Sequence, residues 1–230
     1  MKVAVYSGSF NPLHIGHLAI IRHMIEKAGF DMVYLIVSPK NPLKDSISSA
    51  TGHERYLAAI EAVNRHFRHS CPSIWSTEPS EDIPDTPVFA SLRHPLAGGG
   101  MCPSCPSEGS GCSTKVKVDD IELTMPEPHY TIRTLNALRA REPENSFTLV
   151  IGADNLADIR HWRDYGSILK DFGVAVFPRA GHDLETIKQD LLEEDPAYKI
   201  QIADAPLVNI SSTEIREAVL SGKDASHLMM

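Results

Sequence analysis

The sequence predicts a single α/β domain over residues 1–230, built on a parallel β-sheet and carrying a long irregular insertion. Two observations support this prediction. Short apolar runs alternate along the chain with segments whose apolar residues recur at helical spacing. Such alternation is typical of a parallel sheet that helices cover on both faces. Residues 70–114 show no such periodicity, so we expect an insertion or long loop there.

The expected elements follow this alternation from the first residues onward. Strands are short apolar runs, and helices carry apolar residues three and four positions apart. Thr51 and Glu54 fit a capping box at the start of the second helix, and Gly29 is suited to end the first. In chain order we expect a strand over 2–8, a helix over 15–27, a strand over 32–38, a helix over 51–67, a strand over 115–123, a helix over 130–141, strands over 147–154 and 172–179, a helix over 183–194, extended chain over 199–210 and a helix over 211–222.

The bulk composition excludes several classes of protein. The formal net charge of −8 disfavours a general nucleic-acid binder, and an anionic small substrate would need a local cluster of cations. The apolar runs are far shorter than a membrane span. Gly8, Asn11 and Pro12 interrupt any signal-peptide pattern at the N-terminus. We therefore expect a cytoplasmic protein that binds neither nucleic acid nor membrane.

The stretch YSGSFNPLHIGHLAII, residues 6–21, is the first candidate site. Gly8 allows the backbone to approach a ligand closely, and His14 and His17 face the same way near the first turn of a helix. The N–H groups at a helix start favour anions, so a triphosphate is one possible ligand. Two other interpretations stay open, since an H-x-x-H pair is more often structural and sometimes part of a metal site.

The stretch NISSTEIREAV, near the C-terminus, is the second candidate site. Ser211 and Glu214 fit a capping box, and this simple interpretation requires no ligand. Ser212, Thr213 and Arg216 would also form an anion site at the same helix start. In parallel sheets ligands bind beyond the carboxyl ends of the strands, where the opening loop, Gly152–Asp154 and Arg179 are all expected.

These motifs carry a resemblance to a known family. G-S-F-N-P-x-H-x-G-H followed by I-S-S-T-x-I-R is similar to the H-x-G-H nucleotidyltransferases. Between them, SPKNPLK, HERYLAAIEAV, DIEL…YTIRTL, IGADNLADIRHW and FPRAG resemble the bacterial nicotinate mononucleotide adenylyltransferases. The resemblance covers residues 1–69 and 115–227. It implies a Rossmann-like doubly wound parallel sheet, and the transfer of an adenylyl group from ATP to nicotinate mononucleotide.

On the ATP side, the resemblance implies in-line attack on the α-phosphorus with no covalent enzyme intermediate, and Mg²⁺ bound with ATP. His14 and His17 would contact the triphosphate, with His17 acting in the transition state. Arg216 would bind the β- and γ-phosphates. The other residues that the resemblance assigns to ATP are Gly8, Ser9, Phe10, Lys44, Gly152, Asp154, Ser212 and Thr213. Asp154 as a helix cap and Lys44 as a solvated lysine are the simpler alternatives.

On the acceptor side, the resemblance implies that three residues contact nicotinate mononucleotide. Trp162 would stack on the pyridine ring, Thr131 would lie by its carboxylate, and Arg179 is a further phosphate candidate. Trp162 as a core or interface aromatic and Thr131 as an ordinary helix-start residue are the alternatives. The sequence leaves open the preference for nicotinate over nicotinamide mononucleotide, and also the oligomeric state.

The insertion separates this chain from the resemblance. It holds seven of the 16 prolines, five of the 14 glycines and all four cysteines. Cys102 and Cys105 have C-x-x-C spacing, and Cys71 and Cys112 would complete a Cys₄ zinc site, although the composition is more typical of disorder. Metal analysis of the purified protein separates the two.

Two other functions remain open. One is a pantetheine-phosphate adenylyltransferase, which shares both end motifs; the GAD segment over residues 152–154, Trp162 and the greater chain length argue against it. The other is a nucleotide- or metal-binding module without turnover, and the intact His14, His17 and Arg216 argue for an enzyme instead.

Overall fold

The structure is a computed structural model that describes residues 1–39, 50–67, 115–205, 212–225 and 228–230. By internal packing the chain divides into two units. The first consists of Met1–Phe67 with Lys115–Met230 and is the one described below. The second, Arg68–Thr114, lies outside the described residues, and it contains the whole predicted insertion over 70–114 together with the two residues before it.

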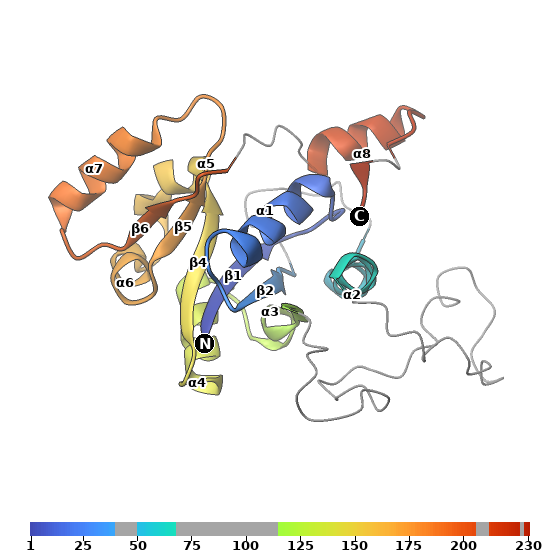
Figure 1. The fold of residues 1–230 in the computed structure, drawn as a ribbon. Coiled ribbons are helices and arrows are strands. Elements are labelled where there is room, and N and C mark those ends of the chain that lie inside the picture. The colour runs from blue at the N-terminus through green and yellow to red at the C-terminus, as the bar shows by residue number, and fades with distance from the viewer. Residues whose placement is uncertain (40–49, 68–114, 206–211, 226–227) are drawn as a thin grey trace. The chain divides into compact units, whose positions relative to one another are not determined.

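Within the described residues, six parallel strands form one sheet in the order β3-β2-β1-β4-β5-β6 (Figure 1). Their bounds are β1 (Lys2–Gly8), β2 (Met32–Val37), β3 (Val116–Asp119), β4 (Ser146–Gly152), β5 (Val174–Phe177) and β6 (Ile200–Ile202). This order confirms the predicted doubly wound α/β fold. The order reverses between β1 and β4, and the crevice beyond their carboxyl ends is where such sheets bind ligands.

Helices connect the strands. In the part of the chain that the structure describes, the helices longer than eight residues are α1 (Ile15–Glu26), α2 (Gly52–Phe67), α4 (Thr131–Arg141), α7 (Leu184–Glu194) and α8 (Ser212–Leu220). The shorter helical segments are α3 (Ile121–Thr124), α5 (Ala153–Ala157), the 3₁₀ turn η2 (Ile159–His161), α6 (Tyr165–Ser167) and the π-helical turn η3 (Ile168–Phe172). Among the described residues, none of these helices combines the length and apolar character that crossing a membrane requires.

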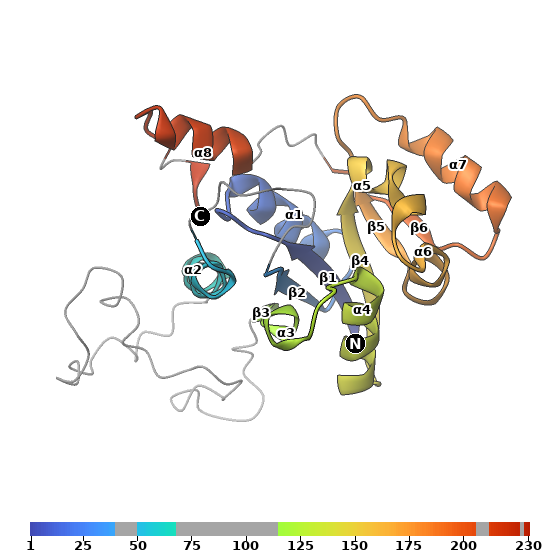
Figure 2. The same ribbon diagram turned by 180° about the vertical axis from the view of Figure 1, so that it is seen from behind.

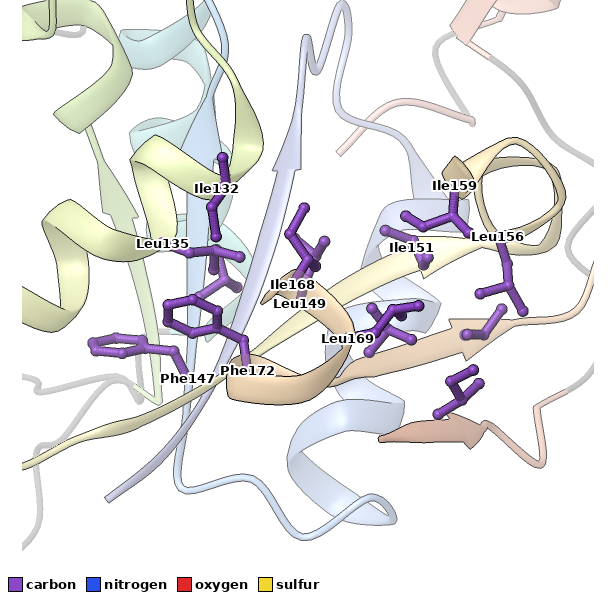
Figure 3. Close-up of a cluster of buried hydrophobic side chains, with 14 of the residues drawn as sticks. Ile132, Leu135, Phe147, Leu149, Ile151, Leu156, Ile159, Ile168, Leu169 and Phe172 are labelled. Atoms are coloured by element: carbon purple, nitrogen blue, oxygen red, sulfur yellow. The ribbon is translucent and has the colours of Figure 1, made fainter. Parts of the chain in front are cut away.

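Two apolar clusters cover the two faces of the sheet. Successive strand residues point to opposite faces, so Leu149 and Ile151 belong to one cluster and Val150 to the other. The first cluster includes residues of α4 and α7 and is shown in Figure 3. The second includes residues of α1 and α2. Figures 1 and 2 accordingly show α1 over one face and α4 over the other. Both faces are buried, which explains the nearly continuous apolar strands.

Local signals decided where several elements begin or end. Thr51 and Glu54 form the predicted capping box, with Thr51 N–H donating to Glu54 Oε2 at 2.6 Å and Glu54 N–H to Thr51 Oγ1 at 3.2 Å. Gly29, just beyond α1, has a φ of +72°, a conformation that favours glycine.

Some predicted bounds were wrong. The strand expected over 115–123 ends at Asp119, because the Asp119 carboxylate accepts the Ile121 N–H at 3.1 Å and starts the short helix α3. The strand expected over 147–154 ends at Gly152, and Asp154 already belongs to α5. The strand expected over 172–179 is confined to β5, because Phe172 ends η3. Beyond β6, residues 206–210 lie outside the described residues.

Candidate active site

The loop after β1 lies at the point where the strand order reverses. Phe10 is buried and has a φ of +44°. Its ring is 3.3 Å from the position that a Cβ on Gly8 would take, so a side chain at Gly8 would have to displace the ring. The same ring meets Tyr6 and His17 edge-on, with centroid distances of 5.3 and 5.2 Å. Close packing therefore sets the backbone of this loop.

His14 and His17 form a reciprocal cap at the start of α1. His14 is the N-cap residue, and its Nδ1 accepts the N–H of Gly16 at 3.2 Å. His17 Nδ1 accepts the N–H of His14, also at 3.2 Å. The two rings lie 3.7 Å apart between centroids. The sequence predicted that the two imidazoles face the same way, and the structure confirms this.

These hydrogen bonds assign the tautomer of both imidazoles. A ring nitrogen that accepts a backbone N–H carries no hydrogen, so the hydrogen of a neutral ring lies on the other nitrogen. In His14 and His17 the accepting atom is Nδ1, and Nε2 is therefore the donor. The site thus presents two N–H donors, which suit phosphate oxygens, beside the N-terminus of a helix.

Both imidazoles are neutral near pH 7. Burial lowers the pKa of His14 to about 4, helped by the charge of Arg179 and opposed by Glu214. Burial lowers the pKa of His17 to about 3, helped by His14 and Arg179. In this state both rings donate from Nε2 without a positive charge of their own.

The C-terminal motif lies directly against the opening loop, 205 residues away in sequence. Arg216 on α8 donates from Nη1 to the Asn11 carbonyl at 2.7 Å and from Nη2 to Thr213 Oγ1 at 3.0 Å. Ser212 Oγ donates to the Pro12 carbonyl at 3.2 Å. The structure therefore brings the two candidate motifs together. Ser211, the other half of the predicted capping box at this helix, lies outside the described residues.

Gly152, Asp154 and Arg179 lie together at the carboxyl ends of β4 and β5. Arg179 Nε lies 3.3 Å from Asp154 Oδ1, and a Cβ on Gly152 would press on both side chains. Gly152 holds the N-cap position of α5, so the alternative that Asp154 caps this helix is wrong. Asp154 instead lies in the first turn, where the helix dipole favours a carboxylate.

Thr131 and Trp162 lie on two segments that share a pocket. Thr131 is the first residue of α4, and Trp162 follows η2 and packs half-buried against the first apolar cluster. The neighbours of both residues line an open pocket of about 460 Å³. The packing of Trp162 agrees with its alternative interpretation as a core aromatic and leaves part of the side chain exposed.

Arg55 is a buried residue that sequence reasoning missed. From α2 it donates to the carbonyls of Ser9 at 2.5 Å, Ser38 at 2.8 Å and Pro39 at 2.8 Å. Burial lowers its pKa from the usual arginine value. It therefore joins the loops that follow β1 and β2. Arg55 lies on the same face of α2 as the buried Ala59 and Ala62, and this helical spacing could have indicated that it is buried.

Glu122 is the second missed residue. It is 3% exposed, and its carboxylate accepts hydrogen bonds from Ser38 Oγ at 2.6 Å, Thr134 Oγ1 at 2.8 Å and Ser7 Oγ at 3.4 Å. These donors come from the ends of β1 and β2 and from α4. Glu122 lies in a segment expected to be strand, and its partners are distant in sequence, so no local pattern indicated it.

Some predicted site residues cannot be placed. Lys44, Cys71, Cys102, Cys105 and Cys112 lie outside the described residues. Within the part of the chain that the structure describes, there is no group of three or more His, Cys, Asp or Glu side chains arranged to hold a metal ion.

The fold, and the H-x-G-H segment at the point where the strand order reverses, define a nucleotidyltransferase. The chain belongs to the Cytidylyltransferase-like family, which matches residues 5–75 and 108–218. Similar proteins are the probable nicotinate-nucleotide adenylyltransferases of Flavobacterium johnsoniae and Bacteroides fragilis, each 31% identical. The alignments cover 100% and 99% of this chain, and 92% and 87% of those proteins. These relatives place the chain in the nicotinate-nucleotide adenylyltransferase branch of the family.

Solved structures show the same fold. The Plasmodium falciparum nicotinic acid mononucleotide adenylyltransferase complexed with NaAD matches with a TM-score of 0.64 at 17% identity, over 98% of this chain and 87% of that one. The complex of that enzyme with APC matches with a TM-score of 0.58 at 15% identity over the same shares.

Proposed function

We propose that this enzyme transfers the adenylyl group of ATP to nicotinate mononucleotide, giving nicotinate adenine dinucleotide and pyrophosphate. The observation that carries the proposal is the convergence of two neutral Nε2–H donors with Arg216 at the point where the strand order reverses. The names of the aligned relatives support the choice of acceptor.

The reaction is an in-line displacement at the α-phosphorus of ATP. A phosphate oxygen of the mononucleotide attacks, the bond to the β-phosphate bridging oxygen breaks, and pyrophosphate leaves. No protein nucleophile is needed, so catalysis consists of placing two anions and stabilising the charge that develops on the leaving group. His17 Nε2–H would donate to an oxygen whose charge rises in the transition state, and His14 Nε2–H to a neighbouring one.

The remaining residues would hold the substrates. Arg216 would contact the β- and γ-phosphates from the start of α8, together with Ser212 and Thr213. Arg179 has a cationic side chain on the β4 side, close enough to influence both imidazoles, and would contact phosphate. The closely packed backbone of Gly8–Phe10 would lie along the nucleotide.

Magnesium fits this site as a companion of ATP. The described groups at the crevice are mainly imidazole N–H donors and guanidinium groups, which suit phosphate oxygens, so phosphate and water would hold the ion. When bound, Mg²⁺ would neutralise charge on the phosphate oxygens.

The test is pyrophosphate release by the purified full chain with ATP and Mg²⁺. Acceptors offered one at a time are nicotinate mononucleotide, nicotinamide mononucleotide and phosphopantetheine. We expect release with nicotinate mononucleotide and identification of the dinucleotide by mass spectrometry. Release with phosphopantetheine alone would show a different acceptor, and release with none of the three would indicate a binding module.

A further inference from the structure

We propose that Arg163 selects the acid form of the pyridine mononucleotide, with Arg133 as a second positive charge beside it. This inference rests on the proposed function, because it concerns which pyridine ring the same site accepts. Nicotinate and nicotinamide mononucleotides share a phosphate, a ribose and an aromatic ring. They differ where one carries a carboxylate and the other a neutral amide, so discrimination requires groups that respond to that charge.

The pocket beside Thr131 and Trp162 is lined by more positive than negative side chains. Its lining residues are Pro128, Tyr130, Ile132, Arg133, Arg163 and Asp164. Two arginines against one aspartate give this lining a formal charge of +1, in a chain whose formal net charge is −8. An anionic substrate of so acidic a chain needs a local cluster of cations, and this pocket contains two arginines.

Arg133 supplies a positive charge whose position is fixed. Its Nη1 donates to the carbonyls of Pro126 at 3.1 Å and Pro128 at 2.6 Å. These partners hold the guanidinium but carry no formal charge, so they leave its positive charge uncompensated. An arginine stays protonated at all working pH values, and a cation held in place before binding loses little entropy when an anion arrives.

Arg163 supplies a positive charge that is free to move. It forms an ion pair with Asp164, with 3.6 Å between Nε and Oδ2, and the two side chains are 67% and 59% exposed. A long, exposed ion pair of this kind contributes little to stability, so the side chain can turn toward a ligand at low cost. A ring carboxylate would offer Arg163 two parallel hydrogen bonds, which a neutral amide cannot match.

Asp164 makes this role of Arg163 more important for the acid than for the amide. Its carboxylate lines the same pocket and would repel a ring carboxylate once Arg163 were removed. An amide ring carries no charge and would meet no such repulsion. Loss of Arg163 should therefore weaken acceptance of the acid specifically.

The experiment compares kcat/KM for the two mononucleotides at saturating ATP in the wild type, Arg163→Gln and Arg160→Gln. Arg160 is the matched control, because it lies in the same segment but pairs with Glu194 and does not line the pocket. For Arg163→Gln we expect kcat/KM to fall about tenfold with nicotinate mononucleotide and to change less than about twofold with nicotinamide mononucleotide. Arg160→Gln should leave the ratio unchanged.

Equal losses with both mononucleotides would show that Arg163 contacts a shared group such as the phosphate, and would overturn the inference. An unchanged kcat/KM with nicotinate mononucleotide would overturn it as well. A second measurement titrates each mononucleotide into the protein by calorimetry without ATP. Tighter binding of the acid, reduced in Arg163→Gln, supports the inference even if no adenylyl transfer occurs, a result that counts against the proposed function alone. Equal binding of the two by the wild type overturns the inference.

Discussion

His14 and His17 show how much a few local contacts decide about a site. Each Nδ1 accepts a backbone N–H at the start of α1, and this leaves each Nε2 as a donor. Burial keeps both rings neutral, so their donor character does not change with pH near neutrality. Transition-state stabilisation by such positioned donors is usually large, because the groups are already oriented when charge develops.

Replacing His17 with Asn tests this role directly. Asn Oδ1 can replace Nδ1 as the acceptor of the His14 N–H, whereas the Nε2 donor is lost. We expect kcat to fall about 10²- to 10³-fold, with a smaller change in KM, because the lost interaction belongs to the transition state. His17→Gln, whose amide N–H reaches closer to the position of Nε2, should recover part of kcat. An unchanged kcat with a raised KM in His17→Asn would contradict the role.

The same two histidines predict how stability depends on pH. Their folded pKa values, about 4 and about 3, lie below the ordinary value near 6.5, so the unfolded chain binds more protons between those limits. The contribution of these histidines to the free energy of unfolding should have its full value above pH 6.5, and it should decrease as the pH drops toward 4. Each imidazole contributes a slope of up to about 1.4 kcal/mol per pH unit.

Urea unfolding from pH 7 to pH 4.5 measures this slope. His17→Asn should flatten the slope, because it removes one of the two groups. His161→Asn, which replaces an imidazole on the surface, is the control for the exchange of histidine for asparagine itself. Parallel curves for all three proteins would show that the histidines are not the cause.

At the scale of elements, α2 and α8 hold the loops that form the site. Arg55 of α2 bonds to carbonyls after β1 and after β2, and Arg216 of α8 bonds to the carbonyl of Asn11. Two helices from different parts of the chain therefore shape one loop. Helix bounds alone would not reveal this, because the contacts depend on single long side chains.

Replacing Arg55 with Met should both destabilise the protein and weaken ATP binding. Three partly buried carbonyls would lose their donor, and we expect a loss of about 3 kcal/mol in the free energy of unfolding, together with a raised KM for ATP. Arg65→Met is the control in the same helix, because Arg65 is exposed and pairs only with Glu61 in the described residues. That variant should lie within about 0.5 kcal/mol of the wild type. Equal losses in both variants would exclude a special role for Arg55.

Sequence reasoning recovered the elements whose signals are local. The capping box at Thr51, the paired faces of His14 and His17 and the strands of the sheet all depend on residues close together in the chain. The residues it missed have distant partners: Arg55 bonds to Ser9, 46 residues away, and Glu122 to Ser38, 84 residues away. Between β4 and β5, a helix near Asp154 was considered, but the turns η2, α6 and η3 were missed, because each is only three to five residues long.

At the scale of the whole molecule, the strand order places the loops after β1 and β4 on either side of one crevice. A ligand that bridges them binds the folded state and not the unfolded chain. Binding should therefore raise the melting temperature by mass action.

Saturating ATP with Mg²⁺ provides the measurement. At a concentration about 100 times Kd the gain is about 2.7 kcal/mol, which corresponds to roughly 5–10 °C for a chain of this size. AMP, which lacks the phosphates assigned to Arg216, should give a smaller shift at the same concentration. Equal shifts for ATP and AMP would argue against the proposed contacts of α8 with the triphosphate.

The reciprocal cap of His14 and His17 has a practical consequence for anyone who needs an inactive reference protein. The atoms that start α1 and the atoms proposed to meet the triphosphate belong to the same two rings, so alanine at either position would remove a structural support together with the donor. If such a variant lost activity, the missing donor and the missing helix cap could each be the cause. A dependable inactive reference must keep an acceptor at the Nδ1 position and delete only the far side of the ring.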